Sequence, residues 1–205
     1  MPTKSTPKQA TSKASPMTKV NMAKVFILWL PFAVLVTGLS LFTYVAVQSD
    51  MRQTANNLPT QYAEDAVTAL NNGAPISEVA PTYGINMAKS LDVVVIVTNK
   101  SGKVLAASGQ LNGTPPVPPT SALNSASASG EDAITWQPDN SVREATVIKP
   151  FTTKSQSGYV IAATSLRLVE QNESNLTKMA FVTLFGTLVA SFLLVMLPGT
   201  RDLIQ

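Results

Sequence analysis

The chain of 205 residues contains no cysteine and no histidine, and only 13% of its residues are charged. Without cysteine there is no disulfide, so a domain exported from the cell must rely on its apolar core. Without histidine and cysteine, the commonest general base, the cysteine nucleophile and most zinc sites are excluded. The apolar residues are gathered in long runs rather than spread at helical spacing. These features point away from an enzyme and toward a membrane protein.

Two runs without charge, residues 25–47 and 179–197, have the length of membrane spans. As helices at about 1.5 Å per residue they extend over roughly 34 and 28 Å, which matches a bilayer core of roughly 30 Å. We therefore predict transmembrane helices at residues 24–47 and 179–198. The alternative for the first run is a signal peptide, whose apolar core is usually shorter, and the alternative for the second is a buried core helix.

The charges that flank these runs predict an orientation. Five lysines and no acidic residue precede the first run, whereas residues 48–178 hold nine basic and eleven acidic residues. Because flanking cations resist translocation, we expect a two-pass protein of the plasma or inner membrane, with both termini cytoplasmic and residues 48–178 extracytoplasmic. Residues 1–23 are expected to be a disordered basic tail that lies against anionic lipid and binds no nucleic acid, and residues 199–205 a short cytoplasmic tail.

The central segment, residues 48–178, has the length of one domain. An amphipathic helix is predicted over residues 59–73 and a shorter one within residues 75–90. Strands are predicted at residues 93–97, 103–108, 133–137, 142–151 and 159–165, with an insert rich in proline and serine, holding one short helix, after the second. A last helix leads into the second apolar run. The fold class is therefore α+β: a five-stranded antiparallel sheet with helices on one face, held between two transmembrane helices.

The stretch VVVIVTNKSGKVLAAS and, after an insert, GYVIAATSLRLVEQNESNLTKMAFVTLFG give the chain a family resemblance. It resembles the extracytoplasmic PAS-like (PDC, or single Cache) sensor regions of bacterial two-span sensor histidine kinases and chemoreceptors. The resemblance implies a PAS-like sheet whose last strand feeds the helix of the second span. Such receptors continue into a helix with a phosphoacceptor histidine and an ATP-binding domain. This sequence has no histidine, so we expect a sensor without its own kinase part.

A ligand site is predicted on the strand VREATVIKP and on its neighbours. Arg143 and Lys149 share strand parity, which sets two cations on one face beside apolar residues and suits a small anionic ligand. Trp136 and Tyr159, expected on neighbouring strands, would form the walls of the pocket. The alternative is that Arg143 pairs with an acid across the hairpin, that Lys149 is solvated, and that both aromatic residues belong to the core.

The expected function is that of a membrane-anchored extracytoplasmic sensor or ligand-binding module, which acts through a membrane receptor or kinase as its partner. A structural accessory subunit of a cell-envelope complex is the alternative. No catalytic residue, metal or cofactor is expected, because the adjacent acids at residues 64–65 and 131–132 point apart and no nucleophile or phosphate-loop motif occurs. The spacing of Gly186 and Ala190 leaves a homodimer within the lipid bilayer open.

Overall fold

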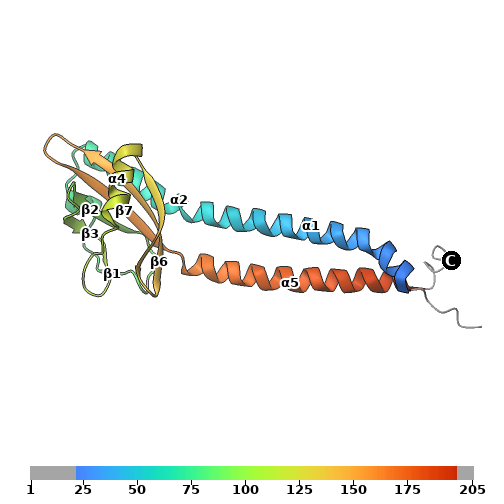
Figure 1. Cartoon of the computed structure of the whole chain (residues 1–205). Helices are drawn as coiled ribbons and strands as arrows, with labels where there is room; N and C mark the ends of the chain where they lie inside the picture. Colours follow the sequence, from blue (N-terminus) through green and yellow to red (C-terminus); the bar gives the residue numbers. More distant parts are fainter. Residues whose placement is uncertain (1–21, 198–205) are drawn as a thin grey trace, which may run out of the picture. The chain divides into compact units, whose positions relative to one another are not determined.

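The computed structural model describes residues 22–197 (Figure 1). The predicted tail at residues 1–23 lies outside the described residues except for its last two, which begin the first helix, and the predicted tail at residues 199–205 lies outside them altogether. In chain order the elements are α1 (Met22–Ala55), α2 (Asn57–Asn71), α3 (Ile76–Val79), β1 (Ile85–Asn86), β2 (Val94–Asn99), β3 (Val104–Ala107), β4 (Gly109–Gln110), α4 (Thr120–Ser129), β5 (Asp132–Asp139), β6 (Val142–Thr152), β7 (Ser157–Ser165) and α5 (Arg167–Met196).

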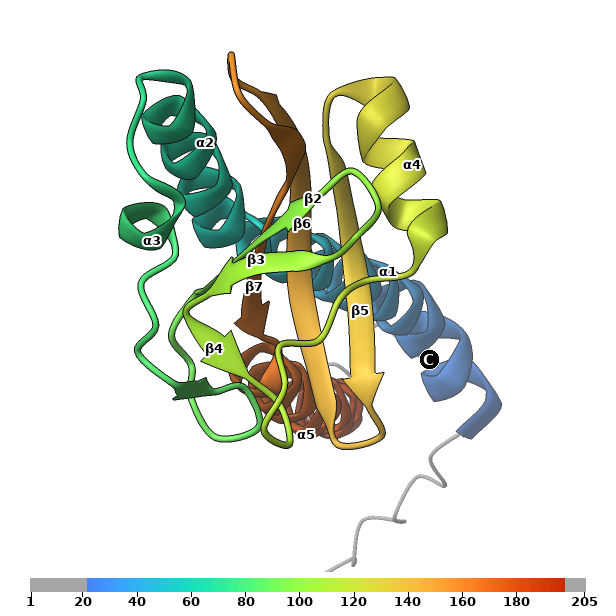
Figure 2. The same ribbon diagram turned by 90° about the vertical axis from the view of Figure 1, so that its left-hand side faces the viewer.

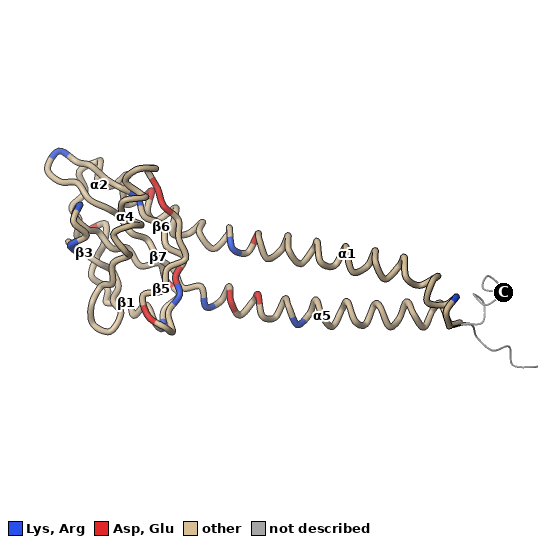
Figure 3. Tube along the Cα trace, in the orientation of Figure 1, with Lys and Arg blue, Asp and Glu red and all other residues tan. Residues whose placement is uncertain are grey.

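Two helices are long and apolar enough to cross a membrane. Within Met22–Asn71, which joins α1 and α2, and within Arg167–Met196, an 18-residue window reaches a mean hydropathy of 2.3. Residues 25–49 and 179–197 hold no charged side chain, and Figure 3 accordingly draws these stretches in tan, without the blue or red of charged residues. Only 11% and 0% of the two windows are buried, whereas the core helix of a soluble domain buries an apolar stripe. Two helices suited to a membrane are therefore present.

Contacts divide the chain into two compact units, Met1–Gly38 with Leu184–Gln205, and Leu39–Thr183. In the described part of the first unit, Trp29 joins α1 to α5. Its indole Nε1 donates to Ser191 Oγ over 2.9 Å, and its ring meets Phe192 edge-on with centroids 5.5 Å apart. Gly186 and Ala190 are exposed, and a Cβ added at Gly186 would meet nothing within 4 Å. The predicted small-residue pair therefore does not form this helix contact.

The second unit is built on a five-stranded antiparallel sheet in the order β3-β2-β7-β6-β5. The α+β class and the five predicted strands are confirmed, as are the helix after Pro119 and the amphipathic helix α2. Gly102, in the turn between β2 and β3, has the positive φ of +81° that the turn requires. The short parallel pair of β1 with β4 was not predicted, because pairs of two residues leave no periodic pattern in a sequence.

Helices cover both faces of the sheet: α2 lies on one face, as predicted, and α4, from the insert whose helix was predicted without a face, covers the other. Figure 2 shows α2 and α4 on opposite sides of the strands. On one face, α2 packs against a core that includes Val147, Phe151 and Val160. On the other, α4 joins a core that includes Ile96, Trp136 and Ile161. The reason lies in the central strands, which are apolar on both sides. A single helical layer would leave one apolar side of these strands exposed to solvent.

Gly158 of β7 gives the first testable prediction. A Cβ at this position would collide with the carbonyl oxygen of Thr98 on β2, and a backbone atom of a paired strand cannot move aside. We expect Gly158→Ala to lower the free energy of unfolding of the full chain by about 1–3 kcal/mol in chemical denaturation. The adjacent substitution Ser157→Ala is the control and should change it by less than about 0.5 kcal/mol. Equal stability of the two variants would contradict the close approach of β2 and β7.

Candidate functional site

The sheet passes directly into the last helix. β7 ends at Ser165 and α5 begins at Arg167, so Leu166 alone separates them. The Leu166 N–H donates to the carbonyl oxygen of Arg143 on β6 over 2.9 Å, and the Leu166 carbonyl accepts the N–H of Glu170 in α5, also over 2.9 Å. Leu166 thus extends the strand pairing with its N–H and starts the helical hydrogen bonding with its carbonyl. We call residues 164–167 the junction.

Two side chains tie the junction to the segment that precedes β2. The guanidinium of Arg167 donates to the carbonyl oxygens of Ala88 and Lys89, over 3.3 and 3.0 Å. The Thr164 hydroxyl donates to the carbonyl oxygen of Leu91 over 3.1 Å. The first residue of α5 is therefore held by backbone groups from a distant part of the chain. A displacement of the junction or of the segment before β2 would strain the hydrogen bonds that join them.

Glu144 is buried beside the junction. Its partners across the sheet are Ser165 on β7 and Trp136 on β5, and it is 2% exposed. Within residues 22–197 its Oε1 has no hydrogen-bond partner, and neither has the hydroxyl of Thr146 two positions along the strand. Burial raises the pKa of Glu144 from the ordinary 4.5 to about 7, although the charge of Arg167 acts in the opposite direction. Buried carboxyl groups with a shifted pKa are typical of functional sites.

The raised pKa of Glu144 makes the stability of the fold depend on pH. Because the folded chain holds this proton more tightly than the unfolded chain, the contribution to stability is fully present below about pH 4.5 and is lost as pH rises through about 7. The whole difference amounts to roughly 3 kcal/mol. An ionised Glu144 therefore destabilises the folded unit at alkaline pH.

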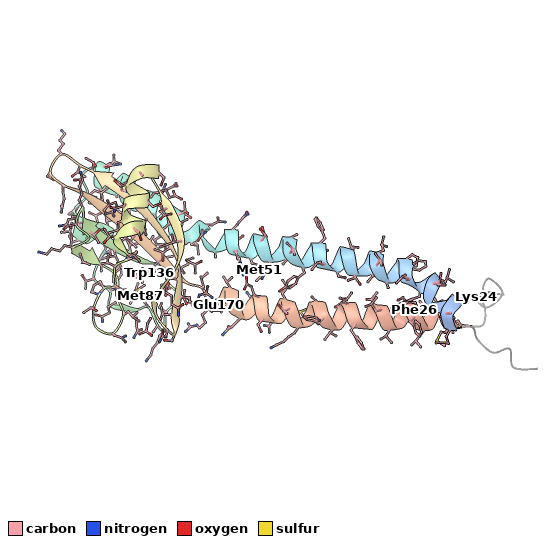
Figure 4. All side chains as sticks on the ribbon, viewed as in Figure 1. Lys24, Phe26, Met51, Met87, Trp136 and Glu170 are labelled. Carbon is pink, nitrogen blue, oxygen red and sulfur yellow. The ribbon has the colours of Figure 1, made fainter. Side chains whose placement is uncertain are left out.

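The four residues of the predicted ligand site do not lie in one pocket. Trp136 and Tyr159 are buried in the core on the α4 side, where Figure 4 shows Trp136 near Met87, and β6 separates their two strands. Arg143 and Lys149 alternate with the residues of that core and lie on the opposite face, which α2 covers. The expectation that the aromatic residues sit on neighbouring strands is corrected, and the aromatic residues form no wall beside the two cations.

Both cations are held by acids. Lys149 Nζ lies 2.8 Å from Glu64 Oε1 on α2 and 2.8 Å from Glu131 Oε2, which precedes β5. Burial lowers the pKa of Lys149, but the hydrogen bonds to Glu131 and Glu64 outweigh it and the net shift is upward. Arg143 donates to Glu170 in the first turn of α5, so its acid comes from the helix rather than from across the hairpin. The expectation of a solvated Lys149 is likewise wrong.

Two hollows border the junction. One, of about 370 Å³, is lined mainly by apolar side chains from α1, α2, α5 and the segment before β2, among them Met51, Leu58, Leu91, Leu166, Leu168 and Val169. The other, of about 230 Å³, is polar and includes the ion pairs Arg143 to Glu170 and Arg52 to Glu173. Within the described part of the chain, no three acidic side chains gather to hold a metal ion.

Glu144 was missed by the sequence reasoning, although strand parity could have found it. In VREATVIKP it shares a face with Val142 and Ile148, both of which are buried in the core on the α4 side. An acid at the parity of the buried residues is the signal. The ligand site was predicted on Arg143 and Lys149, which have the other strand parity.

Lys149 gives a prediction about stability. Replacing it by methionine leaves the acids of α2 and of the start of β5 facing each other without their shared cation. We expect Lys149→Met to lower the free energy of unfolding by about 1 kcal/mol at low salt, measured by chemical denaturation of the full chain. Lys154→Met, in the exposed turn before β7, is the matched control and should change it by less than about 0.5 kcal/mol. A larger loss for Lys154→Met would disprove the role of Lys149.

Comparison of this chain with protein-family models, with curated proteins and with solved structures finds no match. The resemblance to PAS-like sensor regions therefore stays a prediction from the sequence. What the chain does has to be inferred from its own junction, its buried carboxyl group and its apolar helices.

Proposed function

We propose that this protein is a membrane-anchored sensor module, whose α+β domain passes a change in its sheet through α5 to a partner in the membrane. The observation that carries the proposal is the junction, where Leu166 is hydrogen-bonded in both the sheet and the helix. A domain that merely needed a tether would be served by a flexible link. A direct strand-to-helix passage transmits displacement, because both elements are stiff.

Contacts along α5 support transmission within the second unit. Its first turn is paired with the sheet through Glu170 and Arg143. Further along, Glu173 accepts from Arg52 of α1 over 3.0 Å, and the hydroxyls of Thr177 and Tyr44 lie 3.0 Å apart. A shift of α5 is therefore a shift against α1. Two helices that change register against each other offer a discrete signal, whose size is limited by the difference in affinity of the input for the two states.

The membrane placement belongs to the same proposal. We infer that α1 and α5 each span the bilayer once, that both termini are cytoplasmic, and that the sheet lies outside the membrane as a PAS-like domain. The support is the apolar composition of both helices and the lysines that precede residue 25. The proposed partner is a membrane receptor or kinase, because a signal that leaves through α5 is delivered at the membrane.

A structural accessory subunit of an envelope complex is the second candidate, and one observation favours it. The two cations that were expected to bind a ligand are paired with acids, and the two aromatic residues are core. A small anionic ligand therefore finds no unpaired cation at these positions. A structural subunit would hold α5 in one position under all conditions, which separates the two candidates experimentally.

The placement can be tested with single cysteines, since the chain has none of its own. Ser101→Cys, in the turn between β2 and β3, should react in intact cells with a maleimide that cannot cross membranes. Ser5→Cys, in the lysine-rich tail, should react only after permeabilisation. Labelling of Ser5→Cys from outside, with Ser101→Cys protected, would reverse the orientation, and labelling of both in intact cells would exclude the two-span arrangement.

Transmission can be tested by cross-linking α5 to α1 in membranes. One variant pairs Tyr44→Cys with Thr177→Cys and a second pairs Tyr44→Cys with Ala180→Cys, nearly one turn further along α5. A short bifunctional maleimide joins the cysteines, because the contact of Tyr44 with Thr177 is made by the tip of the long tyrosine side chain. For a sensor, we expect the ratio of the two cross-link yields to change at least about twofold among growth media that differ in pH, salt or nutrient. Two glycines inserted after Leu166 should abolish that change. A ratio that is constant in every medium would favour the structural subunit.

A further inference from the structure

The chain has no side chain whose ordinary pKa lies near neutrality, because it contains neither histidine nor cysteine. A side chain that responds to protons near neutral pH must therefore be one whose pKa its surroundings have altered. Glu144 is such a group, and it lies in the strand that pairs with the junction. Its position raises the question of what a buried acid does beside the start of α5.

Among the described residues, Arg167 is the charged group that acts on Glu144. Trp136 and Ser165 lie opposite it on the neighbouring strands, and Val142 and Thr146 share its face of β6. None of these four side chains is charged. From α5, the guanidinium of Arg167 acts on the carboxyl group electrostatically, without an ion pair between them within 4.0 Å. The ion pairs that Arg143 and Lys149 form with acidic side chains lie on the opposite face of the sheet.

We propose that Glu144 is a proton-binding site and that the proton is an input which the domain passes to α5. The inference rests on the proposed function and names the ligand of the sensor. When Glu144 is protonated, the buried group is neutral and Arg167 stays on the carbonyl oxygens of Ala88 and Lys89. When the proton leaves to solvent, the buried carboxylate attracts Arg167, its nearest source of positive charge.

The geometry links this change to the helix. Arg167 is the first residue of α5, so a movement of its side chain toward Glu144 weakens the hydrogen bonds that hold the helix start to the segment before β2. The neighbouring Leu166 is hydrogen-bonded to Arg143, the residue adjacent to Glu144. Proton loss at Glu144 thus acts on the junction in two ways, through the side chain of Arg167 and through the backbone of β6.

The chain contains its own reporter for this site. It has two tryptophans, and Trp136 is the cross-strand partner of Glu144. In the full chain with Trp29→Phe, reconstituted in vesicles, Trp136 fluorescence should show one transition between about pH 5 and 9, because ionisation of an adjacent carboxyl group changes its environment. We expect a midpoint at about 7. Glu144→Gln should remove the transition, and Arg167→Gln should move the midpoint upward, since the cation that favours ionisation is gone.

Glu78→Gln, an exposed acid on α3, is the matched control and should leave the transition unchanged. A flat titration of the parent chain, or a transition that persists in Glu144→Gln, would overturn the proton site. The cross-link ratio between α1 and α5 is then measured across the same pH range. A ratio that follows the fluorescence, and that becomes independent of pH in Glu144→Gln, supports the whole inference.

Two further outcomes separate this inference from the proposed function. If the fluorescence transition depends on Glu144 but the cross-link ratio does not change with pH, protons bind at Glu144 and have no effect on α5, so the link to the helix is wrong. If the ratio responds to another condition and not to pH, the module senses something else and the proton is overturned as its input. In that second case the proposed function stands.

Discussion

Leu166 belongs to two hydrogen-bonding systems at once, and the architecture of the second unit depends on that. Its N–H continues the pairing of β7 with β6, and its carbonyl begins the pattern of α5. Leu166 is the single residue between β7 and α5, and both of its backbone hydrogen-bonding groups are engaged. The orientation of the start of α5 is consequently fixed by the sheet, and the ion pairs of Glu170 and Glu173 then fix its first turns against β6 and α1. The start of α5 is therefore tied to the sheet by backbone and by side-chain contacts.

The filling of both faces of the sheet determines where a functional group can lie. The central strands β2 and β7 are buried throughout most of their length, and α2 and α4 close the two sides. A core of this kind has no room for a polar ligand unless a side chain gives way. The two hollows described above lie where the sheet ends, next to the junction. Binding at that edge would act on α5 without first opening the core.

The sequence predicted the elements better than their contacts. Strand positions, the turn at Gly102 and the helix that follows β7 depend on local patterns, which a single sequence displays. The partners of Lys149, in contrast, do not follow from a local pattern. Glu64 lies 85 positions away in the chain, and only the packing of α2 on β6 brings its carboxylate to Lys149. The same holds for α4, which was predicted as a short helix of the insert but whose sheet face depends on which apolar surface remained uncovered.

Glu144 is the residue for which packing alone gives no reason. A leucine or a glutamine there would avoid a penalty of roughly 3 kcal/mol at alkaline pH, which is a large part of the 5–15 kcal/mol that typically stabilises a domain. The carboxyl group forms no ion pair that would offset the penalty, and its Oε1 is left without a hydrogen bond among the described residues. Its one charged neighbour is the residue that begins α5. In the proposed sensor, a group that destabilises the sheet by an amount set by pH, and that acts electrostatically on the first residue of α5, would couple acidity to the position of that helix.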